Sequence, residues 1–255
     1  MSTVTALVLA GSRPEGDPFA ASHGANTKAL IPVCGEPMVL RPVRALLACD
    51  DVGEVVVLTQ RPELLAEVLA EQPKLSIRRS LGTIADTLAE LCHDPATSWP
   101  MLVTTADHAL LTPAMVAEFI DKAQGADIAV AFVESKALLA RFPNAERTWL
   151  AFGGGRYSGA NLFLLGSPSA ERAINMWRSV ESDRKKGFRV LAALGPALFM
   201  GVVLKLRSLH QTAETLSGKL GILVRAVEMS DPLAAIDVDK PSDHALVEAI
   251  LQQRA

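Results

Sequence analysis

The chain has 255 residues, of which 49% are hydrophobic, and a formal net charge of −3 at pH 7. This length and hydrophobic content are enough for a well-buried core, so they exclude an intrinsically disordered chain. The nearly balanced charge gives no uniform positive field that would attract nucleic acid or an anionic membrane. A local cluster of charges would therefore have to hold any anionic ligand, which favours a small-molecule substrate.

The three cysteines are odd in number and show no Cys-x-x-Cys spacing. This pattern argues against a disulfide framework and a zinc site, and it favours a reducing cytoplasm. The apolar start, Met1–Ala10, lacks a basic region and predicts a first strand rather than a signal peptide. No apolar run reaches the roughly 18 residues that an integral membrane segment needs. The oligomeric state is not fixed by the sequence, and a homodimer is compatible with it.

The first half of the chain alternates short apolar runs with amphipathic segments. Four runs predict strands, at 4–10, 55–59, 75–78 and 101–105, and the first, which is rich in β-branched residues, suits a buried parallel strand. Helical spacing follows each of them, at about 38–48, 62–71, 83–92 and from Thr112-Pro113 onward. A long loop, 11–27, shows neither helical nor strand periodicity. This order predicts an α/β fold with a Rossmann-like, mostly parallel central sheet and helices on both faces.

The second half is less regular. Further strands are predicted at 128–133, 149–152, 161–165 and 222–229. Helices are predicted at 168–182, 188–200, 210–218 and through Leu246 and Ile250. No repeat or linker interrupts the chain, so we expect a single domain over 1–255 whose later half completes and caps the sheet.

Ligands of open α/β sheets bind beyond the carboxyl ends of the strands, where the strand order reverses. The first strand ends in Leu9, Ala10, Gly11, Ser12 and Arg13, and the long loop then leads to Lys28. A glycine backbone, an arginine fork and a lysine charge all suit a triphosphate, although a glycine in this place can also be only a turn.

Carboxylates follow the fourth strand and precede the last helix. Asp107 could be a helix N-cap or a metal ligand, and Thr112 already offers a cap for the next helix. His108 beside it is expected to be structural or orienting. Alternation places Asp237 and Asp239 on the same side of an extended segment, and Asp243 fits the first turn of the following helix.

The combination of these motifs resembles the nucleotidyltransferases with a glycosyltransferase-A-like fold. These include the molybdenum-cofactor nucleotidyltransferases, the sugar-phosphate nucleotidyltransferases and CMP-Kdo synthetase. The resemblance runs from the 7–40 signature, with Lys28-Ala-Leu-Ile-Pro-Val and Gly35-x-Pro-Met, through Gly82-Thr83, Asp107 and 158–163 to the closing Ile-Asp-Val-Asp239-x-Pro-x-Asp. It implies transfer of a nucleoside monophosphate from an NTP to a phosphorylated sugar, alcohol or cofactor, with release of pyrophosphate and dependence on Mg²⁺ or Mn²⁺.

The resemblance also implies residue roles. Catalytic roles would fall to Lys28, Arg13 and Asp107. The nucleotide would contact Leu9, Ala10, Gly11, Ser12, Arg13, Lys28, Gly82 and Thr83. The acceptor would meet Gly159 and Asn161. The metal would be held by Asp107 and Asp239, with Asp237 as the alternative to Asp239.

The chain departs from the family signature at Ser12, where a second glycine is usual, and at Pro14, which stiffens the loop. The basic cluster at 184–189, which contains Lys185 and Lys186, is either a solvated helix end or a contact for an acceptor phosphate or a lipid headgroup. Two other functions remain open, a nucleotide-sugar-dependent glycosyltransferase and a non-catalytic nucleotide-binding module. A glycosyltransferase would prefer an Asp-x-Asp pair where this chain has only Asp107.

Overall fold

A computed structural model describes residues 3–11, 16–70, 72–80, 82–94, 96–181 and 207–254, with the side chains of 179–181 left aside. The strands are β1 (Val4–Leu9), β2 (Pro32–Val33), β3 (Glu36–Pro37), β4 (Val52–Thr59), β5 (Leu75–Arg79), β6 (Met101–Thr105), β7 (Ile128–Glu134), β8 (Leu150–Phe152), β9 (Gly155–Leu165) and β10 (Val224–Glu228). The α-helices are α1 (Pro18–Ser22), α2 (Leu40–Leu47), α3 (Pro62–Ala66), α4 (Ile84–His93), α5 (Pro113–Ala123), α6 (Ser135–Arg141), α7 (Glu171–Glu181), α10 (Leu209–Leu220) and α11 (Pro241–Arg254). Short 3-10 helices lie at η1 (Lys28–Leu30), η2 (Pro168–Ala170) and η4 (Pro232–Ala235).

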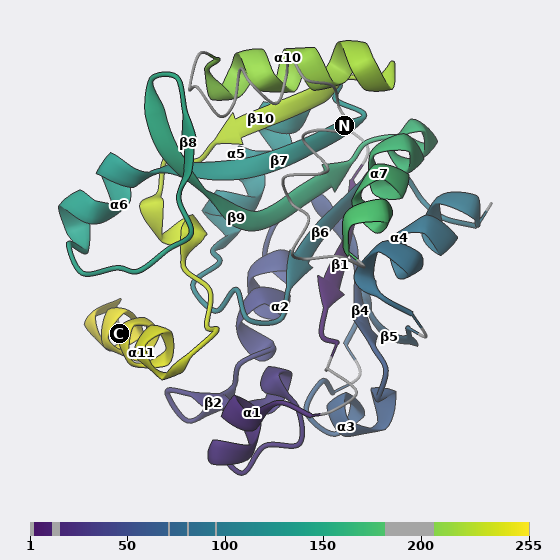
Figure 1. The fold of residues 1–255 in the computed structure, drawn as a ribbon. Coiled ribbons are helices and arrows are strands. Elements are labelled where there is room, and N and C mark those ends of the chain that lie inside the picture. The colour runs from purple at the N-terminus through teal and green to yellow at the C-terminus, as the bar shows by residue number, and fades with distance from the viewer. Residues whose placement is uncertain are drawn as a thin grey trace.

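The main sheet has the strand order β10-β7-β9-β6-β1-β4-β5, and β8 pairs with β9 at its margin (Figure 1). Neighbours among β5, β4, β1 and β6 are parallel, as are β7 and β10. Strand β9 runs antiparallel to both β6 and β7 and separates them. The expected α/β fold with a mostly parallel sheet is therefore confirmed, and the strand predicted at 128–133 continues the sheet only beyond an antiparallel insertion.

The strand order reverses between β1 and β6. From β1 the chain first adds β4 and β5 on one side, and then crosses to place β6 on the other. The carboxyl ends of β1, β4 and β6 all lie at the edge of the sheet that faces α1, β2 and the segment leading to α11 (Figure 1). This edge is where an open α/β sheet binds its ligands.

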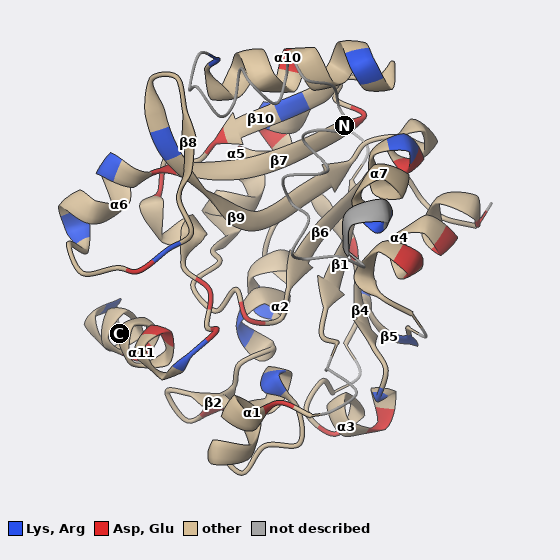
Figure 2. Ribbon diagram, in the orientation of Figure 1, with Lys and Arg blue, Asp and Glu red and all other residues tan. Residues whose placement is uncertain are grey.

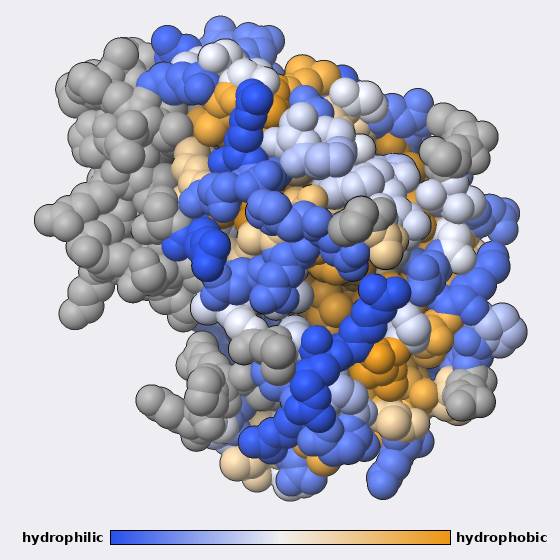
Figure 3. Space-filling model, turned by 90° about the vertical axis from the view of Figure 1, so that its right-hand side faces the viewer, coloured by the Kyte–Doolittle hydropathy of each residue, from blue (hydrophilic) through white to orange (hydrophobic). Residues whose placement is uncertain are grey.

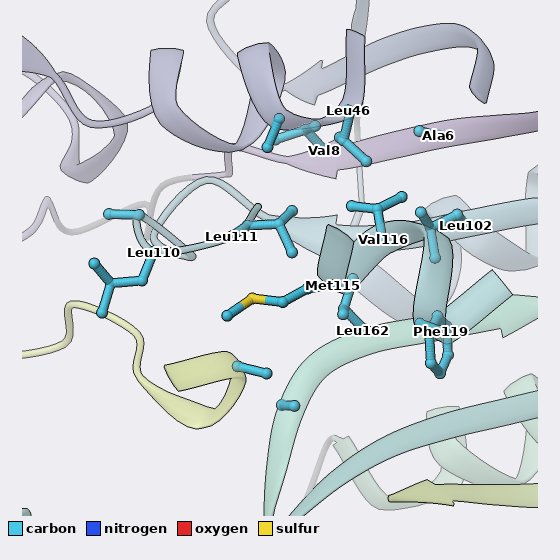
Figure 4. Close-up of a cluster of buried hydrophobic side chains, with 14 of the residues drawn as sticks. Ala6, Val8, Leu46, Leu102, Leu110, Leu111, Met115, Val116, Phe119 and Leu162 are labelled. Atoms are coloured by element: carbon cyan, nitrogen blue, oxygen red, sulfur yellow. The ribbon is translucent and has the colours of Figure 1, made fainter. Parts of the chain in front are cut away.

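Helices cover both faces of the central strands. On one face, α2 and α5 bring Leu46, Val116 and Phe119 against Val8 and Leu102 (Figure 4). Successive side chains of a strand point to opposite faces, so the apolar residues of β1 supply both layers of the core.

On the other face, α4 and α7 place Leu88 and Ile174 over Leu7 and Val103. The outer surface of this side of the molecule is largely hydrophilic, with hydrophobic residues showing between the hydrophilic ones (Figure 3). None of the helices in the described ranges combines the length and the apolar composition that a membrane span requires.

The structure differs from the sequence expectations in several connections. The loop predicted at 11–27 contains a short helix, α1, because the Asp17 side chain accepts a hydrogen bond from Phe19 N at 2.9 Å and Pro18 opens the first turn. Helix α6 was not predicted. The strand expected at 161–165 begins earlier, at Gly155, because that part pairs with β8. The helix predicted at 188–200 lies outside the described residues.

The β8–β9 hairpin offers a matched test of the core. Leu162 on β9 is fully buried, whereas Leu150 on β8 is 47% exposed. Leu162→Ala is expected to lower the free energy of unfolding by about 2–5 kcal/mol, because it removes buried methyl groups and leaves a cavity. The same substitution at Leu150 is expected to cost less than about 1 kcal/mol. Urea denaturation measures both, and equal losses would contradict the assignment of Leu162 to the core.

Candidate functional site

The candidate site begins at the ends of two adjacent strands, β1 and β6. Ala10 N donates to Leu58 O at 2.8 Å, and Ala106 N donates to Leu9 O at 3.0 Å, so both strands are held in the sheet up to their last residues. Gly11 follows directly, and a Cβ added there would lie 3.1 Å from the Gln60 amide nitrogen. Of the residues expected to contact the nucleotide, Leu9, Ala10 and Gly11 lie at this edge. Ser12 and Arg13 lie outside the described residues.

Lys28 connects three parts of the chain that are far apart in sequence. Its Nζ lies 2.5 Å from Asp107 Oδ2 and 2.5 Å from Asp239 Oδ1. Lys28 lies in η1, which fixes its backbone. The next residue of η1, Ala29, is buried, and its main-chain oxygen accepts a hydrogen bond from Val39 N at 3.0 Å. The structure thus brings together the lysine and the two carboxylates that sequence analysis selected.

Asp107 is held by local and long-range contacts. The Thr105 hydroxyl donates to Asp107 Oδ1 at 2.5 Å, which leaves Oδ2 directed at Lys28. Val238 N donates to the main-chain oxygen of Asp107 at 3.1 Å and so ties the C-terminal segment to the loop after β6. The cap of α5 is Thr112, whose side chain accepts from Met115 N at 3.2 Å. Asp107 is therefore not the N-cap of that helix.

Asp239 sits in a polar segment that leads into α11. Its amide donates to Asp243 Oδ2 at 3.3 Å, and Asp243 is in the first turn of α11, as the sequence predicted. The side chain of Asp239 is 63% exposed, so it is the accessible member of the carboxylate pair. Figure 2 shows acidic residues both on this segment and on the loop after β6.

Asp237 has different partners from Asp239. Arg147 donates to Asp237 Oδ1 and, at 3.0 Å, to its main-chain oxygen, while Asn161 Nδ2 donates to Asp237 Oδ2 at 2.7 Å. Arg147 also lies 3.8 Å from Asp243 Oδ1. The two oxygens of Asp237 are thus engaged in the protein, and Asp239 rather than Asp237 faces Lys28.

Burial and neighbouring charges shift the pKa values of these groups in opposite directions. Burial alone lowers the pKa of Lys28, but Asp107 and Asp239 together raise it above its ordinary value, so the ammonium is charged at neutral pH. Burial raises the pKa of Asp237, and the Arg147 guanidinium opposes this change. His108 is fully buried, which lowers its pKa to about 4 despite the neighbouring carboxylate, and its Nδ1 is 3.2 Å from the Thr104 hydroxyl. A neutral, buried imidazole at this position is a structural group.

A hollow of about 260 Å³ adjoins Asp237 and Asp239. It is lined by Arg147, Thr148, Leu150, Ser158, Gly159, Asn161, Ala235, Asp237 and Asp239. Gly159 and Asn161, which were expected to meet the acceptor, therefore open into the same hollow as Asp239. An added Cβ at Gly159 would meet no atom within 4 Å, so the glycine keeps part of the hollow free.

The remaining residues expected to contact a ligand are Gly82, Thr83, Lys185 and Lys186. Gly82 and Thr83 follow β5, and Thr83 forms a capping box with Asp86 at the start of α4. A Cβ at Gly82 would lie 2.7 Å from Asp86 Cβ, so the glycine is required for this helix start. These contacts give both residues a structural role, and their contact with a nucleotide stays a prediction. Lys185 and Lys186 lie outside the described residues.

The donor set after β6 and before α11 suits a hard divalent cation. Asp107 Oδ2 and Asp239 Oδ1 both reach one cationic atom, the Nζ of Lys28, and Mg²⁺ commonly binds through one or two carboxylates plus substrate phosphates. The described residues contain no group of three or more His, Cys, Asp or Glu that could hold a metal ion by themselves. The arrangement fits a cation that the protein and a phosphate ligand bind jointly.

Sequence reasoning missed Arg147 and Thr105 as parts of this site. Arg147 lies in the connection between α6 and β8, where no periodic pattern marks it, and its side chain is only 9% exposed. Thr105 was counted only as the last residue of a strand. Its position two residues before Asp107 is the one signal that could have identified it.

The chain matches the family model of the MobA-like NTP transferase domain over residues 6–197. No curated protein sequence matches it. Among solved structures, it resembles a hypothetical transferase from Thermus thermophilus, with 28% identity and a TM-score of 0.79 over 95% of this chain and 99% of that one.

Two more distant structures share the fold. The 4-diphosphocytidyl-2C-methyl-D-erythritol synthase of Anaerococcus prevotii is 9% identical, with a TM-score of 0.61 over 98% of this chain and 96% of that one. A CMP:2-keto-3-deoxy-manno-octonic acid synthetase in complex with CTP is 14% identical, with a TM-score of 0.56 over 100% of this chain and 99% of that one. At this identity the likeness concerns the fold, a glycosyltransferase-A-like nucleotidyltransferase fold.

The Arg147–Asp237 pair can be tested through stability. Arg147→Met is expected to lower the free energy of unfolding by about 3 kcal/mol, because it leaves the largely buried Asp237 carboxylate, 19% exposed, without its cation. Arg156→Met, which removes the same charge from an exposed position on β9, is expected to change it by less than about 0.5 kcal/mol. Urea denaturation at pH 7 compares them, and a small effect at Arg147 would show that the pair does not hold the segment.

Proposed function

The chain belongs to the family of MobA-like NTP transferase domains, and on this premise we propose that it transfers a nucleoside monophosphate from an NTP to a phosphorylated small molecule. The acceptor is a sugar, alcohol or cofactor phosphate, and the second product is pyrophosphate. One observation carries the proposal. Lys28, Asp107 and Asp239 converge at the carboxyl edge of the sheet, beside Gly11 and at the point where strand order reverses.

The reaction needs charge stabilisation and alignment more than proton transfer. An oxygen of the acceptor phosphate attacks the α-phosphorus, the bond from that phosphorus to the oxygen bridging to the β-phosphorus breaks, and pyrophosphate leaves. The attacking oxygen is already anionic, so no general base is required. The buried, neutral His108 agrees with a site that contains no catalytic histidine.

A role is proposed for each of these residues, and that of Arg13 rests on the family resemblance alone. Lys28 would bind the α-phosphate and neutralise the charge that builds on it, while the Gly11 backbone and the Arg13 side chain would hold the β- and γ-phosphates. Asp107 and Asp239 would hold Mg²⁺ or Mn²⁺, which when bound supplies Lewis-acid neutralisation of the phosphate oxygens. Asp237 would keep its contacts with Arg147 and Asn161 and shape the acceptor side.

The acceptor would enter the hollow between β9 and the segment before α11. Gly159 and Asn161 line this hollow on β9, and Asp239 lines it from the segment before α11. An acceptor phosphate placed there would lie next to the carboxylate pair and could approach an α-phosphate held by Lys28. Lys185 and Lys186 remain proposed contacts for the acceptor phosphate.

A single acid after β6 favours this activity over a nucleotide-sugar-dependent glycosyltransferase. The described loop after β6 supplies Asp107 alone, and the second carboxylate comes from Asp239, more than 130 positions later in the chain. The partners of the protein would then be an NTP and a phosphorylated small molecule rather than nucleic acid.

Asp107→Asn tests the catalytic role. The substitution keeps the shape of the side chain but removes a charge needed to hold the cation, so the rate of pyrophosphate release is expected to fall by about 100-fold or more. The assay combines each of the four NTPs with Mg²⁺ and a panel of sugar, polyol and cofactor phosphates, after a thermal-shift screen has selected the NTP. Asp121→Asn, on the exposed side of α5, is the matched control and should retain wild-type activity. Full activity in the Asp107 variant would refute the assignment.

Gly159→Val tests the acceptor hollow. The added side chain meets no protein atom at its Cβ, and valine suits a strand, so the fold should be retained. It would occupy space in the hollow, and the KM for the acceptor is therefore expected to rise by about tenfold or more, which corresponds to about 1.4 kcal/mol. The KM for the NTP should stay within about twofold. Steady-state kinetics with each substrate varied in turn separates the two, and a parallel rise in both KM values would place the acceptor elsewhere.

A further inference from the structure

The most unusual contact in the site is that one ammonium group contacts both carboxylates. The Nζ of Lys28 is 2.5 Å from Asp107 Oδ2 and 2.5 Å from Asp239 Oδ1. The side chain is 20% exposed, and η1 fixes the backbone from which it extends. The lysine is therefore built into the space between the two acids.

We propose that Lys28 excludes a divalent cation from the nucleotide-free protein, and that it leaves the space between Asp107 and Asp239 only when a nucleoside triphosphate binds. The inference rests on the proposed function for the identity of the phosphate ligand. It adds an order of events, in which the nucleotide and the cation enter the site together and neither carboxylate is available to the cation alone.

The geometry makes the two occupants mutually exclusive. Asp107 Oδ1 accepts the Thr105 hydroxyl at 2.5 Å, and Oδ2 is the oxygen that contacts Lys28. A cation between Asp107 Oδ2 and Asp239 Oδ1 would occupy the position that Lys28 Nζ now holds. Mg²⁺–oxygen contacts of about 2.1 Å are shorter than these ammonium contacts, so both cations cannot fit between the same two oxygens.

Charge leads to the same conclusion. The two carboxylates and the ammonium together carry one negative charge, which is too little to hold a divalent cation beside a lysine that stays in place. A bound triphosphate changes both the position of Lys28 and the local negative charge, because it offers Lys28 a new anionic partner and supplies further oxygens for the cation. The 63% exposure of Asp239 leaves that carboxylate free to follow either partner.

Binding of Mn²⁺ to the nucleotide-free protein tests the proposal without any activity measurement. Enhancement of water proton relaxation reports Mn²⁺ immobilised on the protein. We expect Lys28→Met to bind Mn²⁺ at least tenfold more tightly than the wild-type protein. Adding Asp107→Asn to Lys28→Met should abolish the gain, since the gain depends on the carboxylate pair. Equal affinities of wild type and Lys28→Met, or a gain that survives in the double variant, would overturn the proposal.

Lys240→Met is the matched control for charge. Lys240 is adjacent to Asp239 in sequence, but its ammonium bonds to Glu146 rather than to the carboxylate pair. Removing the Lys240 ammonium lowers the local positive charge as much as Lys28→Met does, but it does not empty the space between Asp107 and Asp239. We expect less than a twofold change in Mn²⁺ affinity. A gain as large as that of Lys28→Met would show that net charge alone controls the affinity and would overturn the proposal.

The wild-type protein provides a second measurement that does not depend on variants. Mn²⁺ alone should give little enhancement, and Mn²⁺ with the NTP selected by thermal shift should give a large one. Equal enhancement with and without NTP would overturn the ordered binding. The proposed function is judged separately by pyrophosphate release. A wild-type protein that releases pyrophosphate yet binds Mn²⁺ without NTP refutes only the ordered binding, whereas absence of pyrophosphate release with every NTP and acceptor refutes the proposed function.

Discussion

The contact of Lys28 with Asp107 and Asp239 is the interaction on which the site depends. It joins the connection after β1, the loop after β6 and the segment before α11, which the sheet alone would leave as independent loops. Partial burial strengthens the attraction, because the effective dielectric constant near these charges is below that of water. The contact thus fixes the relative positions of the groups that a triphosphate and a divalent cation would need.

A second network of ion pairs and hydrogen bonds holds the segment that carries Asp239. Arg147 holds Asp237 and approaches Asp243, while the Asp243 carboxylate accepts the Asp239 amide. Asp239 therefore sits on a segment with ion pairs on both sides, even though its own side chain is mostly exposed. The exposed carboxylate can change partners while its backbone stays in place. Such a division between a fixed main chain and an adjustable side chain suits a group that must contact a lysine in one state and a cation in another.

Much of this arrangement was predictable from sequence because it depends on local patterns. The apolar runs of β1, β4 and β6 set the parallel sheet, and the rule that ligands gather at the carboxyl ends of such strands selected Gly11 and Asp107. Lys28 was selected as a basic residue suited to a triphosphate, and the choice of Asp239 over Asp237 came from the family resemblance. Three features were not predictable. The antiparallel direction of β9 leaves no trace in its apolar alternation, Arg147 acts through a loop of no periodic pattern, and the capping role of Thr83 depends on where α4 begins.

The large sequence separation between Asp107 and Asp239 has a consequence for folding. Strands β1, β4, β5 and β6 come from the first 105 residues, whereas Asp239 lies 132 positions after Asp107. Closing so long a loop costs more entropy than pairing strands of smaller separation, so the contacts of this segment are expected to form after those strands have paired. During refolding Lys28 would then have Asp107 as a partner before it gains Asp239, and these strands would be paired before the site is assembled.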